Sequence, residues 1–465
     1  MKIVFMHYHA KRGGITRVIQ QQMEALRDDA ECLFLAGDAG DGDTRPEPGV
    51  IPGLAYDGLR GPGGPRETAE AILRAITAKW PSGCDILHVH NPLLRKNSDF
   101  LAILRILTRR GLKLFLQVHD AAEDLRPQSY YREEEYPEDC HYGVINSRDH
   151  RVFLEAGLRP EGLHRVYNMV RPLPRGGGPE EGGARRLLLY AVRAIRRKNL
   201  GEALLLSRFL PPGYRVGLTL PPTSPADQPA YREWRTFAAS EGLAADFELG
   251  LSHSLGDLVA RSALMITTSV REGFGFSFLE PWTADRAVVG RRIEAVAPDF
   301  EAAGVDLSSL YPEIRVPLDL IDPDRLRRVW VETAASLCGE FGREPPFDTG
   351  SAWDGITSGG MIDFAFLDAA EARGLISLCG KNGAVRSRLT GANPFLPGLL
   401  DPMSDDELIQ RNRKAVSRSF GLRSYRDTLL DVYRKVSTVQ VSQRIDRKKL
   451  LMSFLRPGNF LLGGI

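Results

Sequence analysis

Two glutamates, Glu272 and Glu280, are separated by seven residues on either side of a glycine-containing turn. The apolar run 264–269 before the turn has the length of a buried strand, and an apolar helix start follows it. A carboxylate buried near a cleft is costly unless hydrogen-bond donors satisfy it. Sugar hydroxyls, which donate in pairs, are natural partners for such a carboxylate. The pattern therefore favours binding of a polyol at the end of this strand.

Two cations, Arg193 and Lys198, stand five positions apart between an apolar strand and a helix. Cations so spaced in a strand-to-helix loop can hold a diphosphate from two sides, through charge-assisted hydrogen bonds. The alternative is a solvated basic loop without a ligand. In either case we expect the Lys198 side chain to be exposed, so that its loss would hardly affect folding.

The first predicted strand leads through Gly13 and Gly14 directly into a helix. Glycines at a helix start let the backbone approach a ligand, and the free N–H groups with the positive end of the helix dipole attract an anion. A purely structural turn is the alternative. Because no G-x-G-x-x-G sequence opens either half of the chain, the pattern weighs against a nicotinamide dehydrogenase.

Several histidines of the first half fall at the carboxyl ends of predicted strands: His7, His9, His88, His90 and His119. Side chains at i and i+2 share one face of a strand, so the first four form two possible metal-binding pairs. No carboxylate or cysteine follows at ligand spacing, and we predict no metal site. His119, with Asp120 beside it at a strand end, is the sharper candidate for a functional histidine. A histidine that only hydrogen-bonds at its strand end is the alternative.

Apolar runs of strand length alternate with amphipathic stretches through both halves of the chain. In the first half, strands are expected at 2–8, 32–37, 85–90, 113–119 and 142–147. In the second half, they are expected at 186–192, 214–220, 246–251, 264–269 and 287–290. Strands that alternate with helices predict parallel sheets covered on both faces, which bind ligands at the carboxyl ends of their strands.

The segment 171–186, rich in glycine and proline, is expected to be a linker between two domains, 1–172 and 184–421. A helix at about 422–437, with Tyr425, Leu429, Val432 and Tyr433 on one face, would pack back on the first domain. Residues from about 340 to 402 are rich in Gly, Pro and Ser and contain one clear helical pattern, 364–372.

Bulk composition excludes several classes of protein. The chain has 465 residues, a net charge of +2 and 43% hydrophobic residues, so no large field of one sign points to nucleic acid. Its five scattered cysteines suit free thiols in a reducing compartment. No window approaches the roughly 20 apolar residues that span a bilayer. We expect a cytoplasmic protein without a transmembrane segment.

Taken together, these motifs resemble the GT-B glycosyltransferases, specifically the large retaining group called glycosyltransferase family 4. The resemblance follows most of the chain in order: the Gly13-Gly14 loop, the strand end at His119-Asp120, the Arg193 and Lys198 pair, and the E-x7-E motif from Glu272 to Glu280. It implies an α/β protein of two doubly wound Rossmann-like domains with a cleft between them.

The resemblance also implies a function and residue roles. The expected reaction is transfer of a sugar from a nucleoside-diphosphate sugar to a hydroxyl acceptor, with retention and without a metal ion or other cofactor. His119 and Glu272 are the expected catalytic residues, beside the donor sugar, and Glu280 would bind the ribose hydroxyls. The expected donor-binding residues are Gly13, Gly14, Arg193, Lys198, Gly273, Phe274, Gly275 and Glu280. The alternatives are an epimerase or phosphorylase of the same fold, or a non-catalytic nucleotide-sugar-binding protein.

The chain departs from the family pattern after Glu280. Arg291 and Arg292 stand where the family has small residues, and segment 340–402 has no usual counterpart. A guanidinium binds phosphate or carboxylate in a bidentate manner, so these arginines, with Asp120, are candidates for an acceptor site with an anionic group. Salt bridges with nearby acids are the alternative. The D-x-D sequences at Asp41 and Asp322 are interpreted as a loop and a helix cap rather than metal sites.

Overall fold

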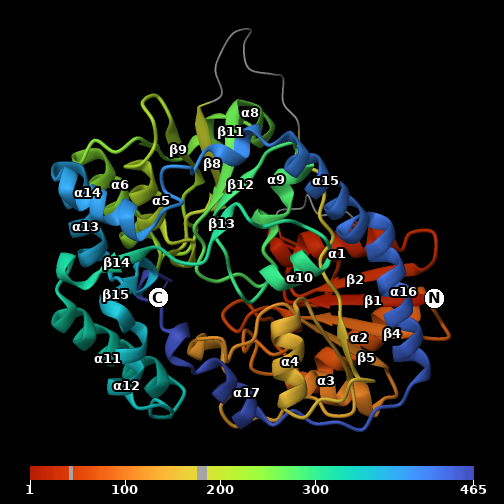
Figure 1. Cartoon of the computed structure of the whole chain (residues 1–465). Helices are drawn as coiled ribbons and strands as arrows, with labels where there is room; N and C mark the ends of the chain where they lie inside the picture. The colour runs from red at the N-terminus through yellow and green to blue at the C-terminus, as the bar shows by residue number, and fades with distance from the viewer. Residues whose placement is uncertain (41–45, 175–185, 465) are drawn as a thin grey trace. The chain divides into compact units, whose positions relative to one another are not determined.

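A computed structural model describes residues 1–40, 46–174 and 186–464 of the chain. Most of the predicted linker and the D-x-D sequence at Asp41 lie outside the described residues. The chain forms two compact units, each with its own parallel sheet (Figure 1). Unit 1 comprises Met1–Met169, Leu337–Arg343 and Phe420–Leu455. Unit 2 comprises Val170–Ser336, Glu344–Ser419 and Arg456–Ile465.

Unit 1 contains a parallel sheet of seven strands in the order β3-β2-β1-β4-β5-β6-β7. Its strands are β1 (Lys2–His7), β2 (Glu31–Ala36), β3 (Gly49–Val50), β4 (Ile86–His90), β5 (Leu114–Val118), β6 (His141–Val144) and β7 (Leu163–Arg165). Its helices are α1 (Gly14–Ala25), α2 (Pro65–Lys79), α3 (Phe100–Arg109), α4 (Ser147–Glu155), α16 (Leu422–Thr438) and α17 (Arg447–Phe454). The doubly wound order confirms the predicted Rossmann-like architecture.

Both faces of the first sheet are covered by apolar side chains. Along β1, Val4 and Met6 belong to the core under α2 and α3, whereas Ile3 and Phe5 belong to the core under α1 and α16. This alternation follows from the two-residue period of a strand. In Figure 1, α16 (blue) runs alongside α1 (red), in line with their direct contacts.

Helix α16 buries the face that the sequence predicts. Tyr425, Leu429, Val432 and Tyr433 are all buried, and they share a core with α1 and β1. A segment more than 400 residues from β1 therefore completes the hydrophobic cover of the first sheet.

Unit 2 contains a parallel sheet of six strands in the order β10-β9-β8-β11-β12-β13. Its strands are β8 (Leu187–Arg193), β9 (Arg215–Leu220), β10 (Ala245–Asp246), β11 (Ser262–Thr267), β12 (Val288–Arg291) and β13 (Leu310–Tyr311). The helices between β8 and β13 are α5 (Leu200–Ser207), α6 (Gln228–Ser240), α7 (Leu249–Ser252), α8 (Leu255–Arg261), α9 (Glu280–Thr283) and α10 (Ala297–Ala302). This order again is doubly wound.

One predicted strand of unit 2 is wrong. The run 246–251 forms only the end of β10, and from Leu249 the chain turns into α7. Glu248, at the junction, has a positive φ of 63°. A short apolar run does not distinguish a buried strand from a buried helix by periodicity, which explains the error.

The segment 340–402 is more helical than its composition suggests. Instead of one helix it contains α12 (Thr349–Ile356), α13 (Ala369–Lys381) and α14 (Gly383–Ala392), after α11 (Pro323–Glu340) and before α15 (Asp406–Phe420). The side chains of Asp348, Asp368 and Asn382 cap α12, α13 and α14 by accepting backbone N–H bonds. The residues 364–366 of the predicted helix form a short 3-10 turn, and the α-helix begins only after its cap at Asp368.

Helix α13 explains how this segment belongs to the fold. All eight residues of α5 are buried, so α5 needs apolar cover on the side away from its sheet. α13 contacts α5 and supplies part of that cover. A short antiparallel pair, β14 (Arg315–Pro317) with β15 (Met361–Asp363), joins the segment to the chain that follows β13.

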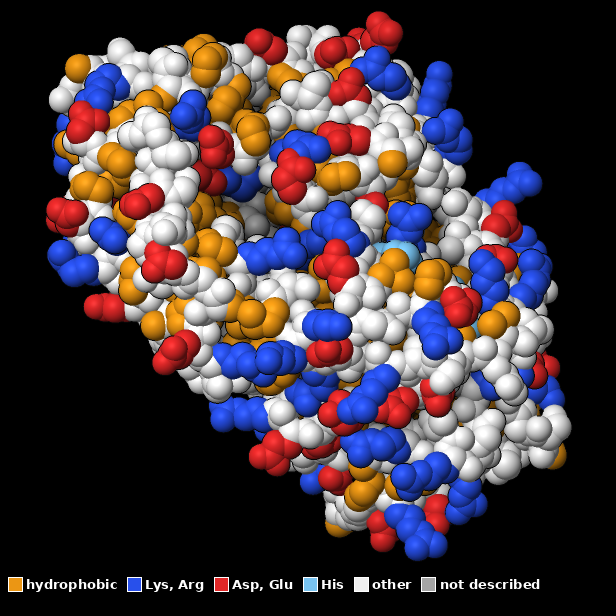
Figure 2. Space-filling model, turned by 60° about the horizontal axis from the view of Figure 1, so that its bottom comes forward, with side chains coloured by type: hydrophobic (Ala, Val, Ile, Leu, Met, Phe, Trp, Pro, Cys, Tyr) orange, Lys and Arg blue, Asp and Glu red, His pale blue; other side chains and the backbone are white. Residues whose placement is uncertain are grey.

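The surface carries mixed charge. On the face drawn in Figure 2, Lys and Arg side chains lie among Asp and Glu rather than forming one field of a single sign. None of the helices in the described part of the chain is both long and apolar enough to cross a membrane. The five cysteines are free thiols, of which Cys140, Cys338 and Cys379 are buried.

Candidate active site

The strand order of unit 2 reverses between β8 and β11. The two strands are neighbours, yet the chain leaves β8 toward β9 on one side and leaves β11 toward β12 on the other. In open α/β sheets, ligands bind outside the carboxyl ends of the strands at such a switch point. The loop with Arg193 and Lys198 follows β8, and the loop with Glu272 follows β11. The fold therefore brings two of the predicted motifs to one place.

These two loops are tied together by hydrogen bonds to backbone atoms. The carbonyl oxygen of Lys198 accepts from the hydroxyl groups of Tyr190 at 2.9 Å and Thr268 at 3.0 Å. The backbone N–H of Val270 donates to the carbonyl of Arg197 at 3.0 Å. The side chains of Lys198 and Glu272 consequently extend from loops that are hydrogen-bonded to each other.

Glu272 forms the centre of the site. Its carboxylate accepts a short hydrogen bond from the Lys198 ammonium and lies 3.3 Å from an Arg197 guanidinium nitrogen. The Glu272 side chain is 8% exposed and that of Lys198 13% exposed. Burial raises the pKa of Glu272, but Lys198 and Arg197 lower it by more, so the net pKa lies below its ordinary value and the group stays ionised. The prediction that Lys198 would be exposed is wrong.

Arg193 differs from Lys198. It ends β8, and its side chain is exposed, with no ion pair or hydrogen bond to another side chain in the described part of the chain. Of the two cations predicted to hold a diphosphate, Lys198 is therefore bound to a buried carboxylate and Arg193 faces solvent.

The turn between the two glutamates contains one position that favours glycine. Gly275 has a φ of 91°, and a Cβ there would lie 2.7 Å from the Phe278 ring. Phe274 is buried against Phe300, at a ring-centroid distance of 5.7 Å. Gly273 is partly exposed. Glu280 is the first residue of α9 and is half-buried.

Arg291 and Arg292 are engaged with acids. Arg291 is 5% exposed and binds Glu202 at 2.5 Å and Asp363 at 2.6 Å. Arg292 forms ion pairs with Glu294 and Glu301. The structure therefore favours the salt-bridge interpretation over an acceptor site, and Arg291 joins α5, β12 and β15 through one guanidinium. Glu202 and Asp363 lie 89 and 72 residues away in sequence, so no local pattern indicated this network.

In unit 1, Gly13 and Gly14 begin α1. Gly13 has an extended φ of −179°, and a Cβ at Gly14 would meet nothing within 4 Å. Neither backbone strain nor packing requires glycine at these positions. Both residues are exposed, and no side chain of the described residues caps the helix. Backbone N–H groups at such a helix start are of the kind that bind an anion.

His119 lies at the carboxyl end of β5 and is 5% exposed. Its Nε2 is 2.9 Å from Nδ1 of His90, at the end of β4. Asn91 accepts from the backbone N–H groups of both His119 and Asp120, at 2.7 and 3.1 Å, and so holds the two strand ends together. Asp120 itself pairs with Arg126 at 2.6 Å. His119 is therefore part of an ordered strand-end network.

The other strand-end histidines also take part in hydrogen bonds. His88 donates to or accepts from Tyr433 and Gln117 at 2.8 and 2.9 Å. Across residues 1–40, 46–174 and 186–464, no three His, Cys, Asp or Glu side chains are grouped to hold a metal ion. The carboxylate of Asp322 accepts from the N–H of Arg325, which makes it a helix cap.

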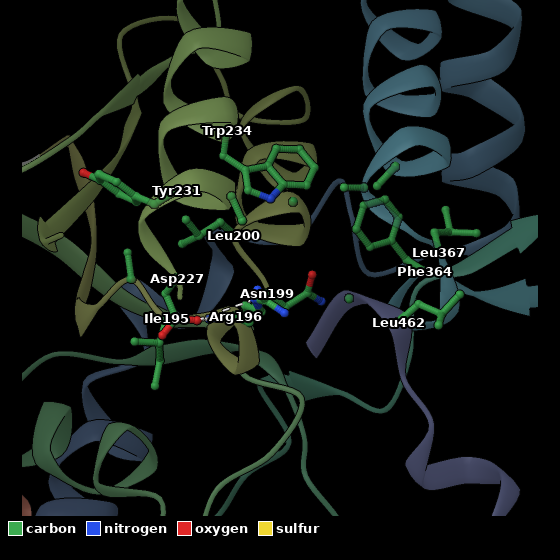
Figure 3. A pocket seen from close by; sticks show the side chains of 16 residues that line it. Ile195, Arg196, Asn199, Leu200, Asp227, Tyr231, Trp234, Phe364, Leu367 and Leu462 are labelled. Atoms are coloured by element: carbon green, nitrogen blue, oxygen red, sulfur yellow. Dashed lines mark hydrogen bonds and ion pairs between the residues drawn. The ribbon is translucent and has the colours of Figure 1, made fainter. Parts of the chain in front are cut away.

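A small cavity lies directly behind the loop that carries Lys198. Its volume is about 160 Å³, and Figure 3 shows Trp234 and Tyr231 from α6 on one side and Phe364 and Leu462 on the other. Arg196 and Asp227 lie at its polar end, 3.7 Å apart. Residues of the loop after β8 and residues of segment 364–372 both line this cavity.

Two residues of the site were not expected from the sequence. Arg197 contacts Glu272, yet it appeared only as one cation within a basic run. His90 contacts His119, and its alternation with His88 indicated only a possible metal pair. In both cases the partner comes from a different strand end, which depends on strand order.

No family model matches the chain. The chain is 22% identical to the mannosylglucosyl-3-phosphoglycerate synthase of Petrotoga mobilis, over 99% of both chains. Among solved structures, it is similar to HepE of Anabaena in complex with UDP, at 13% identity and a TM-score of 0.54, over 93% of this chain and 99% of the other. A sucrose-phosphate synthase from Thermosynechococcus elongatus has 13% identity and a TM-score of 0.52, over 93% and 98%. The chain has the GT-B fold.

This GT-B assignment confirms the predicted fold class of two Rossmann-like domains. The sequence identities to the solved structures are low, so these likenesses establish the architecture and leave the substrates to be argued from the site. The alignment with the relative from Petrotoga spans 99% of this chain and 99% of the relative.

Proposed function

We propose that this protein is a nucleotide-sugar-dependent glycosyltransferase of the glycosyltransferase family 4 type. It transfers a sugar from a nucleoside diphosphate to a hydroxyl group with retention at the anomeric carbon. The observation that carries the proposal is the meeting of Lys198 and Glu272 at the switch point of the second sheet. The full-length similarity to a synthase that, by its name, makes a glycosylated product supports it.

In the reaction, the bond between the anomeric carbon and the β-phosphate oxygen breaks, and its electrons remain on the departing diphosphate. Lys198 and Arg193 stabilise that negative charge, as fixed cations do at other sites where charge develops. The acceptor oxygen bonds to the anomeric carbon on the same face, and its proton passes to the leaving phosphate. Retention is taken from the family resemblance.

In this proposal, the ammonium group of Lys198 exchanges one partner for another when the donor binds. Without donor, Lys198 binds Glu272; with donor, the diphosphate competes for the ammonium group. Once Lys198 moves to the phosphate, Glu272 is released to accept hydrogen bonds from the sugar hydroxyls. Donor binding would thereby prepare the carboxylate for its role at the sugar.

For the acceptor, we propose a hydroxyl compound with an anionic group, of the glycosyl-phosphoglycerate class named in the relative from Petrotoga. Arg291 and Arg292 are not proposed as its ligands, because both are bound to acids.

The test is incubation with nucleotide sugars and either glucose or its phosphoglycerate conjugate. Release of nucleoside diphosphate that depends on the acceptor distinguishes a transferase from an epimerase or a binding protein.

Replacing Lys198 by methionine is expected to weaken nucleoside-diphosphate binding by about 1.5–3 kcal/mol, the usual contribution of a hydrogen bond to a charged group. Isothermal titration calorimetry measures the change. The variant should also lower the melting temperature, because Glu272 is left buried with Arg197 as its remaining cation.

The matched control is Arg196→Met. Arg196 lies in the same 3-10 turn (Arg196–Lys198), but its side chain is directed to Asp227 and the Ala226 carbonyl. Its loss removes one positive charge at nearly the same place and should leave the affinity within about twofold, since exposed charges act weakly. An equal loss of nucleoside-diphosphate affinity in both variants would mean that net charge alone explains the effect. Lys198 would then not be a residue of the donor site.

Activity is expected to survive EDTA at concentrations that strip magnesium and manganese. The positive charge for the leaving group comes from Arg193 and Lys198 of unit 2. The measurement is initial rate after chelation and dialysis, with and without added manganese. Complete loss of turnover that manganese restores would point to a metal-dependent site and contradict the proposed mechanism.

A further inference from the structure

A buried pair of imidazole rings joins β4 and β5 in unit 1. Nδ1 of His90 and Nε2 of His119 are 2.9 Å apart, and the rings are nearly parallel, with an interplanar angle of 17°. His90 is fully buried, and His119 is 5% exposed. A distance of 2.9 Å is that of a hydrogen bond, so one of the two facing nitrogens carries a proton and the other accepts it.

Both rings are neutral at ordinary pH. Burial lowers the pKa of His119 to about 4, and it lowers the pKa of His90 well below its usual value. A neutral imidazole has a single N–H group. Two arrangements remain: His90 donates from Nδ1 to His119, or His119 donates from Nε2 to His90.

The other nitrogen of His90 decides between them. His90 Nε2 is buried, with no hydrogen-bond partner among the described residues. The ring stacks on His88 with centroids 4.3 Å apart, so an in-plane N–H of His90 would not point at that ring face. If His119 were the donor, His90 would carry its proton on this isolated nitrogen. A buried N–H group without a partner is rarer and more costly than a lone pair without one.

We propose that His90 is a positioning residue that holds His119 in the tautomer protonated at Nδ1. His90 donates from its own Nδ1, His119 accepts at Nε2, and His119 therefore presents an N–H donor at Nδ1. No residue in the described part of the chain accepts from that nitrogen. The substrate atom that His119 meets is consequently an acceptor, such as a sugar oxygen. That last step rests on the proposed function, whereas the tautomer rests on unit 1 alone.

The tautomer is measurable without substrate. In the protein with 15N-labelled histidine, long-range 1H–15N correlation spectra distinguish protonated from bare ring nitrogens, and a His119→Gln variant assigns the signals of His119. We expect protonated Nδ1 and bare Nε2 at pH 7.5. A His119 spectrum with protonated Nε2 would overturn the proposal, whatever the enzyme's activity.

Two variants of His90 test whether its N–H donor holds His119 in this tautomer. Asn at this position offers an amide N–H close to the place of Nδ1, whereas Leu offers no donor. We expect His90→Leu to lose about tenfold or more in kcat, the effect of one lost neutral hydrogen bond, and to lose the single Nδ1–H tautomer of His119. His90→Asn should restore most of both. Nucleoside-diphosphate affinity should stay within about twofold in each, because that site belongs to unit 2.

The results distinguish a failure of the proposed role of His90 from a failure of the proposed function. If Asn and Leu lower kcat equally while both variants melt like the wild type, His90 does not act through its donor group. If no nucleotide sugar supports transfer by the wild type, the proposed function fails, and the NMR measurement still decides the tautomer. His90→Leu that fails to fold leaves the wild-type spectrum and His90→Asn as sufficient tests.

Discussion

Replacing Glu272 by glutamine is expected to lower kcat about ten- to a hundredfold while tightening the binding of free nucleoside diphosphate. The lost turnover reflects a charged hydrogen bond to the sugar that strengthens in the transition state. The tighter binding follows from the pair with Lys198: a neutral amide holds the ammonium group less strongly, so the diphosphate no longer displaces a carboxylate. A gain of about 1–2 kcal/mol corresponds to roughly five- to thirtyfold in Kd.

Calorimetry with nucleoside diphosphate and initial rates with the full donor measure the two effects on one preparation. Glu280→Ala is the comparison, because the resemblance assigns Glu280 to the ribose. That variant should weaken nucleotide binding and leave the diphosphate contacts intact. Loss of nucleotide affinity in Glu272→Gln would contradict the exchange of Lys198 between carboxylate and phosphate, even if kcat fell as expected.

The second large effect concerns pH. Burial lowers the pKa of His7 and His88 to about 3 and that of His119 to about 4, and it lowers the pKa of His90 well below its ordinary value. The unfolded chain binds these protons near pH 6.5, whereas the folded chain does not. The contribution of these histidines to the free energy of unfolding is therefore fully present above pH 6.5. It is lost as the pH drops toward 4, by about 1.4 kcal/mol per pH unit for each histidine.

Buried acids of unit 1 act in the opposite direction. Burial raises the pKa of Glu123 to about 7, so its protonated form stabilises the folded chain as the pH falls from 7. Asp149 also has a raised pKa because of burial. Glu123 offsets about one of the four histidines, so each of the others lowers the free energy of unfolding by about 2 kcal/mol by pH 5. This is a substantial part of the 5–15 kcal/mol that typically stabilises a domain.

Thermal melts between pH 8 and pH 5 test this expectation. The variant His88→Gln should melt with a shallower dependence on pH, since one buried site that excludes protons is gone. His253→Gln, which removes a partly exposed histidine of unit 2, is the control and should keep the wild-type slope. A melting temperature that is constant from pH 7 to pH 5 would mean that the cluster takes up protons without unfolding.

Local sequence patterns determined most strands of the two sheets and the loops that carry Lys198 and Glu272. Alternating apolar runs predict strands such as 2–8 and 264–269, because a strand buried on both faces requires continuous apolar residues. Helical spacing of apolar residues placed Tyr425 and Tyr433 on one face of α16, and this face is buried. Lys198 and Glu272 were recognisable because each lies in the loop after a strand, at the end where such sheets bind ligands.

Tertiary structure decided which of those side chains meet. Lys198 finds Glu272 only because β8 lies beside β11, and Arg291 finds Glu202 and Asp363 across long stretches of chain. The sequence shows which residues are charged. Which residue pairs with which depends on the strand order and on loops from distant parts of the chain. Coulomb attraction is strongest at short distance and low dielectric constant, so an arginine beside two buried acids is bound by them rather than left for a substrate. The pairing of His90 with His119 has the same origin, because it requires neighbouring strand ends and a buried environment that keeps both rings neutral.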